Sequence, residues 1–299
     1  MMLDVLTRQC LPVRFQLPLI QDSLTPEQQR VFASLAAHFE AYCAHHALVP
    51  DQVCRDYTGW LEAFSGHLRR YIASGLYPVE YRDGFTCGRI VYDLCLMLST
   101  LVTRHRFRLM EKVAALPGQP AGRALVLGVG AGLELALLEP RWGALSGFDM
   151  QLDEFVRRRF PQVTFHDRLP KEGSFDGIFA IELLEHLADP YGFLARLAGL
   201  LRPGSGRLVV TTARNIPQWD HLHNFHDPRL FRQAIAALGW RVVAEEIIPH
   251  RFQHEFSGFE ADNGFFVLER AEPAAMPCQR QRTGSNFDGR GRPPSTLHR

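Results

Sequence analysis

The sequence predicts an α/β protein in which a doubly wound, mostly parallel sheet follows an amino-terminal helical region. Apolar side chains recur at helical spacing in the first third of the chain, and from Arg123 onward short apolar runs alternate with helical stretches. That alternation is typical of a parallel sheet covered by helices on both faces. We therefore expect a helical region at residues 1–117, an α/β domain at 118–270 and a disordered tail at 271–299.

The helical region contains three predicted helical stretches. The first begins at a capping box, Thr25-Pro26-Glu27-Gln28, with proline at the first helical position. The second follows Pro50, and the third runs from Ile90 to Val113. Pro117-Gly118-Gln119-Pro120 then ends the region.

The second region alternates strands and helices. The predicted strands are Ala124–Leu127, Leu145–Phe148, Val163–Phe165, Gly177–Ile181, Arg207–Thr211 and Phe265–Glu269. The predicted helices are Leu133–Leu138, Leu152–Phe160, Tyr191–Leu201 and Pro228–Leu238. After Arg270 the chain is rich in Pro, Gly, Arg, Gln and Ser, so it cannot bury enough apolar surface to offset its ordering entropy.

Composition favours a small-molecule substrate. With 33 basic and 32 acidic residues, the formal net charge of +1 provides no overall field toward nucleic acid or an anionic membrane. No stretch resembles a signal peptide or a membrane span. The 6 cysteines form no C-x-x-C pair, so we expect reduced thiols in a cytoplasmic protein. Composition does not indicate an oligomeric state.

A glycine-rich turn follows the first predicted strand. Gly128, Gly130 and Gly132 alternate before a helix, and glycine lets a ligand approach the backbone closely. Asp149 lies about 20 residues beyond Gly128, after the second strand, where a carboxylate can bind both ribose hydroxyls. Such a turn alone is weak evidence, because the glycines could merely shape the connection.

Three segments in order resemble class I S-adenosylmethionine-dependent methyltransferases. Leu125 to Asp149 resembles their first cofactor motifs, Ser174 to Leu187 their fourth-strand motif, and Leu200 to Val210 their fifth strand. The segment His221–Phe225 is similar to the type 11/type 23 small-molecule subgroup. The resemblance implies a Rossmann-like methyltransferase fold, S-adenosyl-L-methionine as cofactor, and O-, N- or C-methylation in specialised metabolite biosynthesis.

The resemblance also implies roles for individual residues. The residues expected to bind the cofactor are Gly128, Gly130, Gly132, Asp149, Met150, Asp167, Ala180, Ile181 and Glu182. For Asp167 a turn-capping role is the alternative. The sequence departs from the family at Val126, where an acidic residue usually helps to hold the methionine end of the cofactor.

Three histidines are candidates for proton transfer or substrate contact: His186, His221 and His223. A packing role is the alternative for each of them. Asp220, His221, His223, His226 and Asp227 could also form a metal cluster. The resemblance implies a transfer that needs no metal in most cases, so we expect none.

The helical region is expected to pack over the cofactor edge as a lid that shapes the substrate pocket. Its least regular part supplies the candidate substrate contacts Tyr77, Tyr81, Arg82, Phe85 and Arg89, which could equally be ordinary turn residues. The basic run Arg104–Arg108 is interpreted as a solvated helix face.

Two other functional classes remain open at this level. A nicotinamide-dependent oxidoreductase would use a G-x-G-x-x-G turn, but Leu133 occupies the place of its last glycine. A non-catalytic binding or scaffold protein with a methyltransferase-like fold would be consistent with Val126.

Overall fold

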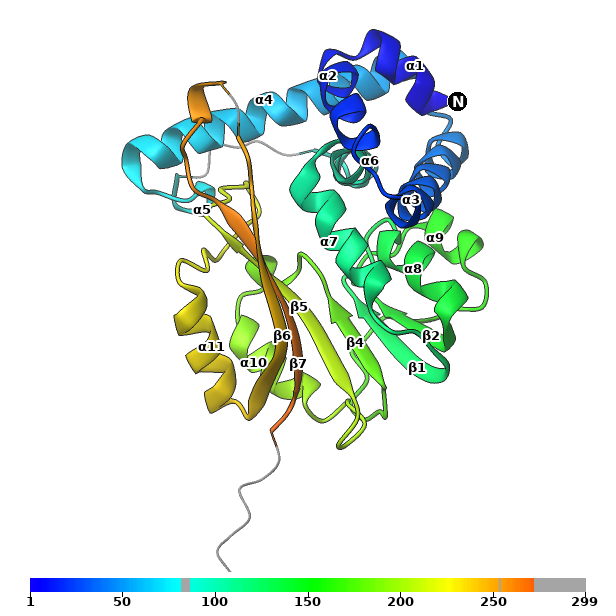
Figure 1. Ribbon diagram of the computed structural model, residues 1–299, viewed down its shortest axis with the longest axis vertical. Helices are drawn as coiled ribbons and strands as arrows, with labels where there is room; N and C mark the ends of the chain where they lie inside the picture. The colour runs from blue at the N-terminus through cyan, green and yellow to red at the C-terminus, as the bar shows by residue number, and fades with distance from the viewer. Residues whose placement is uncertain (82–86, 253, 272–299) are drawn as a thin grey trace, which may run out of the picture.

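The computed structural model describes residues 1–81, 87–252 and 254–271. Seven strands form one sheet in the order β3-β2-β1-β4-β5-β7-β6. Strands β1 to β5 are parallel, and β7 pairs antiparallel with both β5 and β6. The prediction of a mostly parallel, doubly wound sheet is therefore confirmed (Figure 1). The proposed tail at 272–299 lies outside the described residues.

Each of the six predicted strands overlaps an observed strand, although several observed strands are longer, and the structure adds one more. The strands are β1 (Gln119–Leu127), β2 (Trp142–Phe148), β3 (Thr164–His166), β4 (Gly177–Ala180), β5 (Arg207–Arg214), β6 (Trp240–Pro249) and β7 (Asp262–Arg270). The additional strand is β6. Its inner part carries Glu245 and Glu246, and most of its side chains are exposed or half-buried, so it lacks the apolar run of a central strand.

The described part of the amino-terminal region forms seven helices. They are α1 (Met2–Gln9), α2 (Leu11–Gln21), α3 (Pro26–His45), α4 (Pro50–Ser74), α5 (Pro78–Tyr81), α6 (Arg89–Val102) and α7 (Arg104–Ala115). The capping box at Thr25 is confirmed, because its side chain accepts from the Gln28 amide while Gln28 bonds back. The single stretch predicted from Ile90 to Val113 was wrong, since an extended residue, Thr103, separates α6 from α7.

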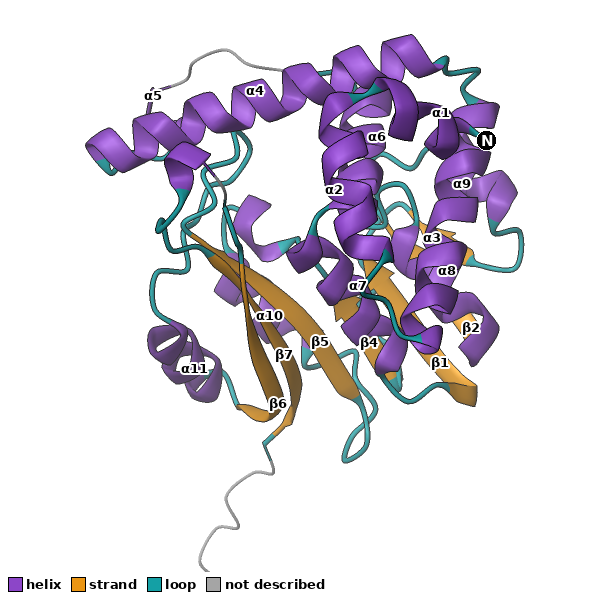
Figure 2. Ribbon diagram, turned by 45° about the horizontal axis from the view of Figure 1, so that its top comes forward, coloured by secondary structure: helices purple, strands orange, loops and turns teal. Residues whose placement is uncertain are grey.

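The two faces of the sheet are covered differently. One core is shared by the helical region, by α8 (Leu133–Leu138) and α9 (Glu154–Arg159), and by the sheet face that carries Val126 and Phe179. The other core joins the opposite face to α10 (Pro190–Leu197) and α11 (Pro228–Ala237). Figure 2 shows these two layers on either side of the strands. No helix formed by the described residues has the length and hydrophobicity needed to traverse a lipid bilayer.

Helix α4 lies across the end of the sheet at which the parallel strands finish (Figure 1). Trp60 of α4 packs edge-on against Trp219 in the loop after β5, and Phe64 stacks on Phe252 after β6. Tyr71 donates a hydrogen bond of 2.8 Å to Asn215 Oδ1. These contacts fix α4 over the carboxyl edge, the side on which open α/β sheets bind ligands.

A buried histidine connects the helical region to the glycine turn. The side chain of His38 on α3 is fully buried, and its Nε2 lies 2.7 Å from the carbonyl oxygen of Ala131. The ring also stacks on Phe160. Burial lowers the pKa of His38 to about 4, so the folded protein holds a neutral imidazole here.

We predict that the free energy of unfolding falls as the pH drops from about 6.5 to about 4. An unfolded histidine binds a proton over that range, whereas folded His38 does not. Its share is about 3 kcal/mol. In His38→Asn, urea unfolding as a function of pH should show a shallower slope over this range.

Phe39→Leu is the matched control, because Phe39 is a neighbouring buried residue that carries no titratable group. That variant should lose stability but keep the slope. An unchanged slope in His38→Asn would contradict the assignment.

Candidate active site

The turn between β1 and α8 requires glycine at three positions. Gly128, Gly130 and Gly132 have φ angles of +66°, +54° and +85°, a region that L-residues rarely adopt. A Cβ at Gly132 would lie 3.0 Å from Phe160, so this glycine also permits tight packing. A Cβ at Gly130 would come no nearer to any atom than 3.9 Å, at the carbonyl oxygen of Gly128. The backbone at Gly130 therefore borders an open space that a side chain would fill.

Asp149 lies beside that open turn. It follows β2 directly, and its Oδ2 accepts a hydrogen bond of 2.9 Å from the amide of Gly130. Its Oδ1 accepts another from the amide of Gln151, at 2.8 Å. A carboxylate has about four acceptor positions, so two remain for the hydroxyl groups of a ligand. The turn and this carboxylate therefore lie together, as their spacing in the sequence predicted.

The other predicted cofactor residues occupy the same edge of the sheet. Met150 is 89% exposed, directly after Asp149. Asp167 follows β3 and is exposed. Ala180 ends β4, and Ile181 comes next, both of them buried. Their roles in cofactor binding stay predictions that rest on this placement.

Val126, the position at which the family usually has an acidic residue, is buried in the core between the sheet and the helical region. Another carboxylate, Glu134, lies on the first turn of α8: burial raises its pKa to about 7, and the positive charge of Arg106 opposes this shift. Arg106 Nη1 also lies 3.2 Å from Glu182 Oε2. The sequence analysis named neither Glu134 nor Arg106.

The interpretation of residues 104–108 as a solvated face was wrong for Arg106. Its side chain is only 16% exposed, and it points toward the end of β4. His105 stacks on His250 at a ring separation of 3.4 Å. The sequence of a helix alone does not show which of its charged side chains contact another element. Here α7 packs against β6 and β7, and this packing partly buries Arg106.

The three predicted histidines divide into two environments. His186 lies in the short helix η2 (Leu184–His186), and its ring packs edge-on against that of His221 at 4.8 Å. His186 is 24% exposed and its Nδ1 lies 3.4 Å from Asp220 Oδ2, whereas His221 is 4% exposed. His223 lies next to Phe225. No measured contact joins His223 to the other two within the described chain.

The predicted substrate residues are only partly described. Arg82 and Phe85 lie outside the described residues, as does the side chain of Tyr81. Tyr77 is 6% exposed, and its hydroxyl accepts a hydrogen bond from the amide of Ile216. Arg89 donates to Asp93 at 2.7 Å, and its Nη2 lies 3.9 Å from Asp149 Oδ2. Arg89 therefore connects the helical region, α1 to α7, to the predicted ribose carboxylate. We call these helices the helical cover, because α4 lies across the carboxyl edge of the sheet.

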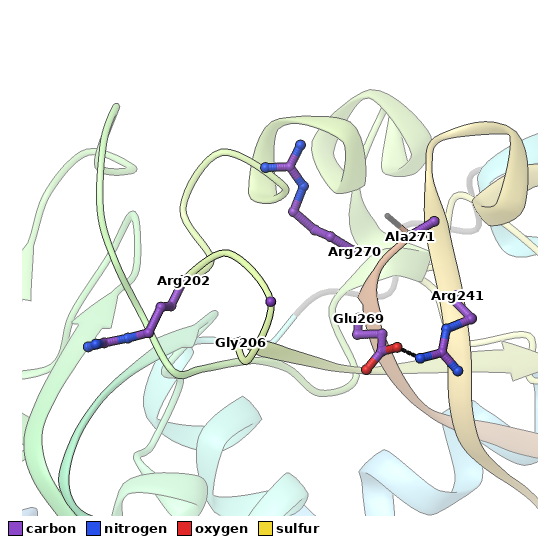
Figure 3. Close-up of a pocket in the computed structure, with 7 residues that line it drawn as sticks. Arg202, Gly206, Arg241, Glu269, Arg270 and Ala271 are labelled. Carbon is purple, nitrogen blue, oxygen red and sulfur yellow. Dashed lines mark ion pairs between the residues drawn. The ribbon is translucent and has the colours of Figure 1, made fainter. Parts of the chain in front are cut away.

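A separate cavity of about 510 Å³ lies at the opposite end of the sheet (Figure 3). It is lined by Arg202, Gly204, Gly206, Arg241, Glu269, Arg270 and Ala271, and an ion pair joins Arg241 to Glu269. This cavity borders the start of β5, so it cannot be the ligand site at the strands' carboxyl ends.

Comparison with known proteins agrees with this geometry. A family model described as a methyltransferase domain matches residues 102–269, more than half of the chain. The ubiquinone biosynthesis O-methyltransferase of Xanthomonas campestris pv. campestris is 31% identical over 121 residues, which cover 36% of this chain and 50% of that protein. The demethylmenaquinone methyltransferase of Tropheryma whipplei is 26% identical over 214 residues, covering 67% and 85%.

Among solved structures, a Burkholderia thailandensis 1,6-didemethyltoxoflavin-N1-methyltransferase with bound S-adenosylhomocysteine aligns at 18% identity and a TM-score of 0.45, over 64% of this chain and 93% of that one. The chain spans about half the length of the first curated relatives it matches. The fold and edge site define a class I α/β transferase architecture. The chain belongs to the class I S-adenosylmethionine-dependent methyltransferase family.

The residues present fit the cofactor of this family, S-adenosylmethionine. The open turn at Gly130 leaves room for the ligand against the backbone, and Asp149 keeps acceptor positions for ribose hydroxyls. Both lie under the helical cover.

We predict that Gly130→Ala weakens the binding of S-adenosylhomocysteine at least tenfold, because the new Cβ projects into the open turn. The fold should survive, with a loss of about 1–2 kcal/mol for the left-handed φ angle. Calorimetric titration measures the affinity, and urea unfolding measures the stability.

Gly204→Ala is the matched control, since Gly204 has a φ of +76° and open space around its Cβ position, far from the cofactor edge. It should cost similar stability and leave affinity unchanged. Equal affinity of Gly130→Ala and the unsubstituted protein would exclude Gly130 from the cofactor site.

Proposed function

We propose that this protein transfers the methyl group of S-adenosylmethionine to a small organic acceptor, held between the carboxyl edge of the sheet and the helical cover. The observation that carries this proposal is the pairing of Asp149 with the open turn at Gly130, at the ends of adjacent parallel strands. Family membership supports the same reaction.

When bound, S-adenosylmethionine supplies a methyl group already activated on a sulfonium, and the reaction is an in-line displacement. The task of the chain is therefore to bind, align and exclude water. Orientation of two reactants can contribute up to about 7–11 kcal/mol. Asp149 and the glycine turn hold the nucleoside half, and Glu134, Arg106 and Glu182 provide charged groups toward the methionine half.

The acceptor is proposed to enter on the side of η2 and of the loop after β5. His186 reaches this side with a partly exposed ring, and His221 lies behind it. Aromatic side chains of α4 and α6 cover the same loop: Trp60 and Tyr92 both pack edge-on against Trp219. These groups would dehydrate an apolar acceptor and leave a polar wall for its nucleophilic atom.

We predict that Asp149→Asn binds S-adenosylmethionine and S-adenosylhomocysteine at least tenfold more weakly, because the amide loses the charge and acceptor positions that a ribose diol requires. Calorimetry measures binding, and circular dichroism shows whether the fold is retained.

Asp51→Asn, which removes an exposed acid on α4, is the control for charge alone. Its affinity should be unchanged. If the unsubstituted protein binds neither nucleoside, the proposed function is wrong and a non-catalytic role for the fold is favoured; binding of a nicotinamide cofactor instead would favour an oxidoreductase.

A further inference from the structure

Three potential metal ligands converge at the carboxyl edge of the sheet, beside the site already described. Glu185 and His186 belong to η2, after β4, and His221 lies in the loop after β5. One ligand atom from each of these side chains lies within 4.8 Å of the other two. The two segments are fixed to each other, because the carbonyl of Glu185 accepts from the amides of Leu222 and His223.

Two of these side chains are buried without the polar partners that burial normally demands. Glu185 is fully buried, and within the described part of the chain neither carboxylate oxygen has a hydrogen-bond partner. His221 is 4% exposed, and its Nδ1 is likewise without a partner there. An isolated buried carboxylate is costly unless it is paired or neutralised.

The guanidinium of Arg106, a neighbouring cation, is already engaged. Arg106 pairs with Glu182 Oε2, and Glu182 Oε1 accepts a hydrogen bond of 2.7 Å from Asn263. Glu182 is thereby satisfied, and Arg106 does not reach Glu185 through any measured ion pair among the described residues. A bound cation would supply the partner that the buried Glu185 carboxylate lacks among the described residues.

We propose that Glu185, His186 and His221 bind one divalent transition-metal ion of the zinc type. Two imidazoles with one carboxylate suit Zn²⁺, Mn²⁺ or Co²⁺, whereas Mg²⁺ and Ca²⁺ prefer oxygen ligands. Ligand atoms about 2.0–2.2 Å from an ion lie roughly 3–4 Å apart, so the three groups need to close by only about 1 Å.

The histidines are oriented as metal ligands usually are, by a hydrogen bond on the remaining ring nitrogen. His186 Nδ1 lies 3.2 Å from the carbonyl oxygen and 3.4 Å from the carboxylate of Asp220. His221 hydrogen-bonds to the backbone of Ile216. His186 is 24% exposed and gives an entry path.

Three protein ligands leave a coordination position open. Resting on the proposed function, we infer that an oxygen of the acceptor occupies this position, because a bound metal orients a hydroxyl and lowers its pKa. The substrate class is then one with an oxygen donor at or next to the methylated atom. From the sequence we expected no metal, because the resemblance implies a transfer that needs none in most cases. The cluster weighed there grouped the exposed His226 with His221 and did not include Glu185.

A second cluster, His45, His46 and Asp153, provides the competing location. Asp153 is already used there, since its Oδ1 caps α9 at Phe155 and its Oδ2 lies 3.4 Å from His46. The experiment must therefore distinguish the two clusters.

The test is calorimetric titration of the full-length, tag-free, chelator-treated protein with ZnCl₂ and separately with MgCl₂. We expect one equivalent of Zn²⁺ to bind, a rise in melting temperature, and no comparable binding of Mg²⁺. Glu185→Gln and His221→Asn should each weaken Zn²⁺ binding at least a hundredfold. Co²⁺ loading should give a visible absorption spectrum that both variants lose.

His226→Gln, an exposed histidine of the same loop, and His46→Gln are the controls, and both should bind as the unsubstituted protein does. No Zn²⁺ binding by the unsubstituted protein, or binding that survives Glu185→Gln and is lost in His46→Gln, would overturn the proposal. Circular dichroism identifies any variant that has not folded. If Glu185→Gln or His221→Asn fails to fold, His186→Gln takes its place: loss of the Co²⁺ spectrum supports the proposed site, and an unchanged spectrum contradicts it. S-adenosylhomocysteine binding in the same samples tests the proposed function separately.

Discussion

The backbone of the turn after β1 borders open space on one side and packed side chains on the other, and glycine is needed at both places. Gly130 borders open space, whereas Gly132 lies against Phe160, and both adopt left-handed angles. Asp149 holds the turn from one side through the Gly130 amide, and His38 holds it from the other through the Ala131 carbonyl. The turn is therefore hydrogen-bonded both to the carboxyl end of β2 and to helix α3 of the helical region.

The helical cover does more than close the edge. Arg89 connects it to Asp149, and Arg106 places a cation against Glu182 at the end of β4. These two arginines place positive charge beside Asp149 and Glu182, at the carboxyl ends of β2 and β4. Val126 stands where the family usually has an acidic residue. It is buried in the core that the sheet shares with the helical region, where an unpaired carboxylate would be costly.

Much of the sheet could be predicted because its central strands, such as β4 and β5, are buried on both faces and therefore appear in the sequence as apolar runs. β6 was missed because it is an edge strand. Among the described strands it pairs with β7 alone, and its side chains are largely exposed. The pairing of the turn with Asp149 was predictable from spacing, since carboxyl ends of parallel strands share one edge. The contacts of Arg106 and Glu185 were not, because they depend on how α7 and η2 pack in three dimensions, and no local pattern encodes that.

The most direct test of the central claim is a crystal structure with S-adenosylhomocysteine. The account predicts the ribose hydroxyls within hydrogen-bond distance of Asp149 and the ligand against the backbone of Gly130. A nucleoside bound elsewhere, or a turn that closes over the open space and rejects it, would contradict the account.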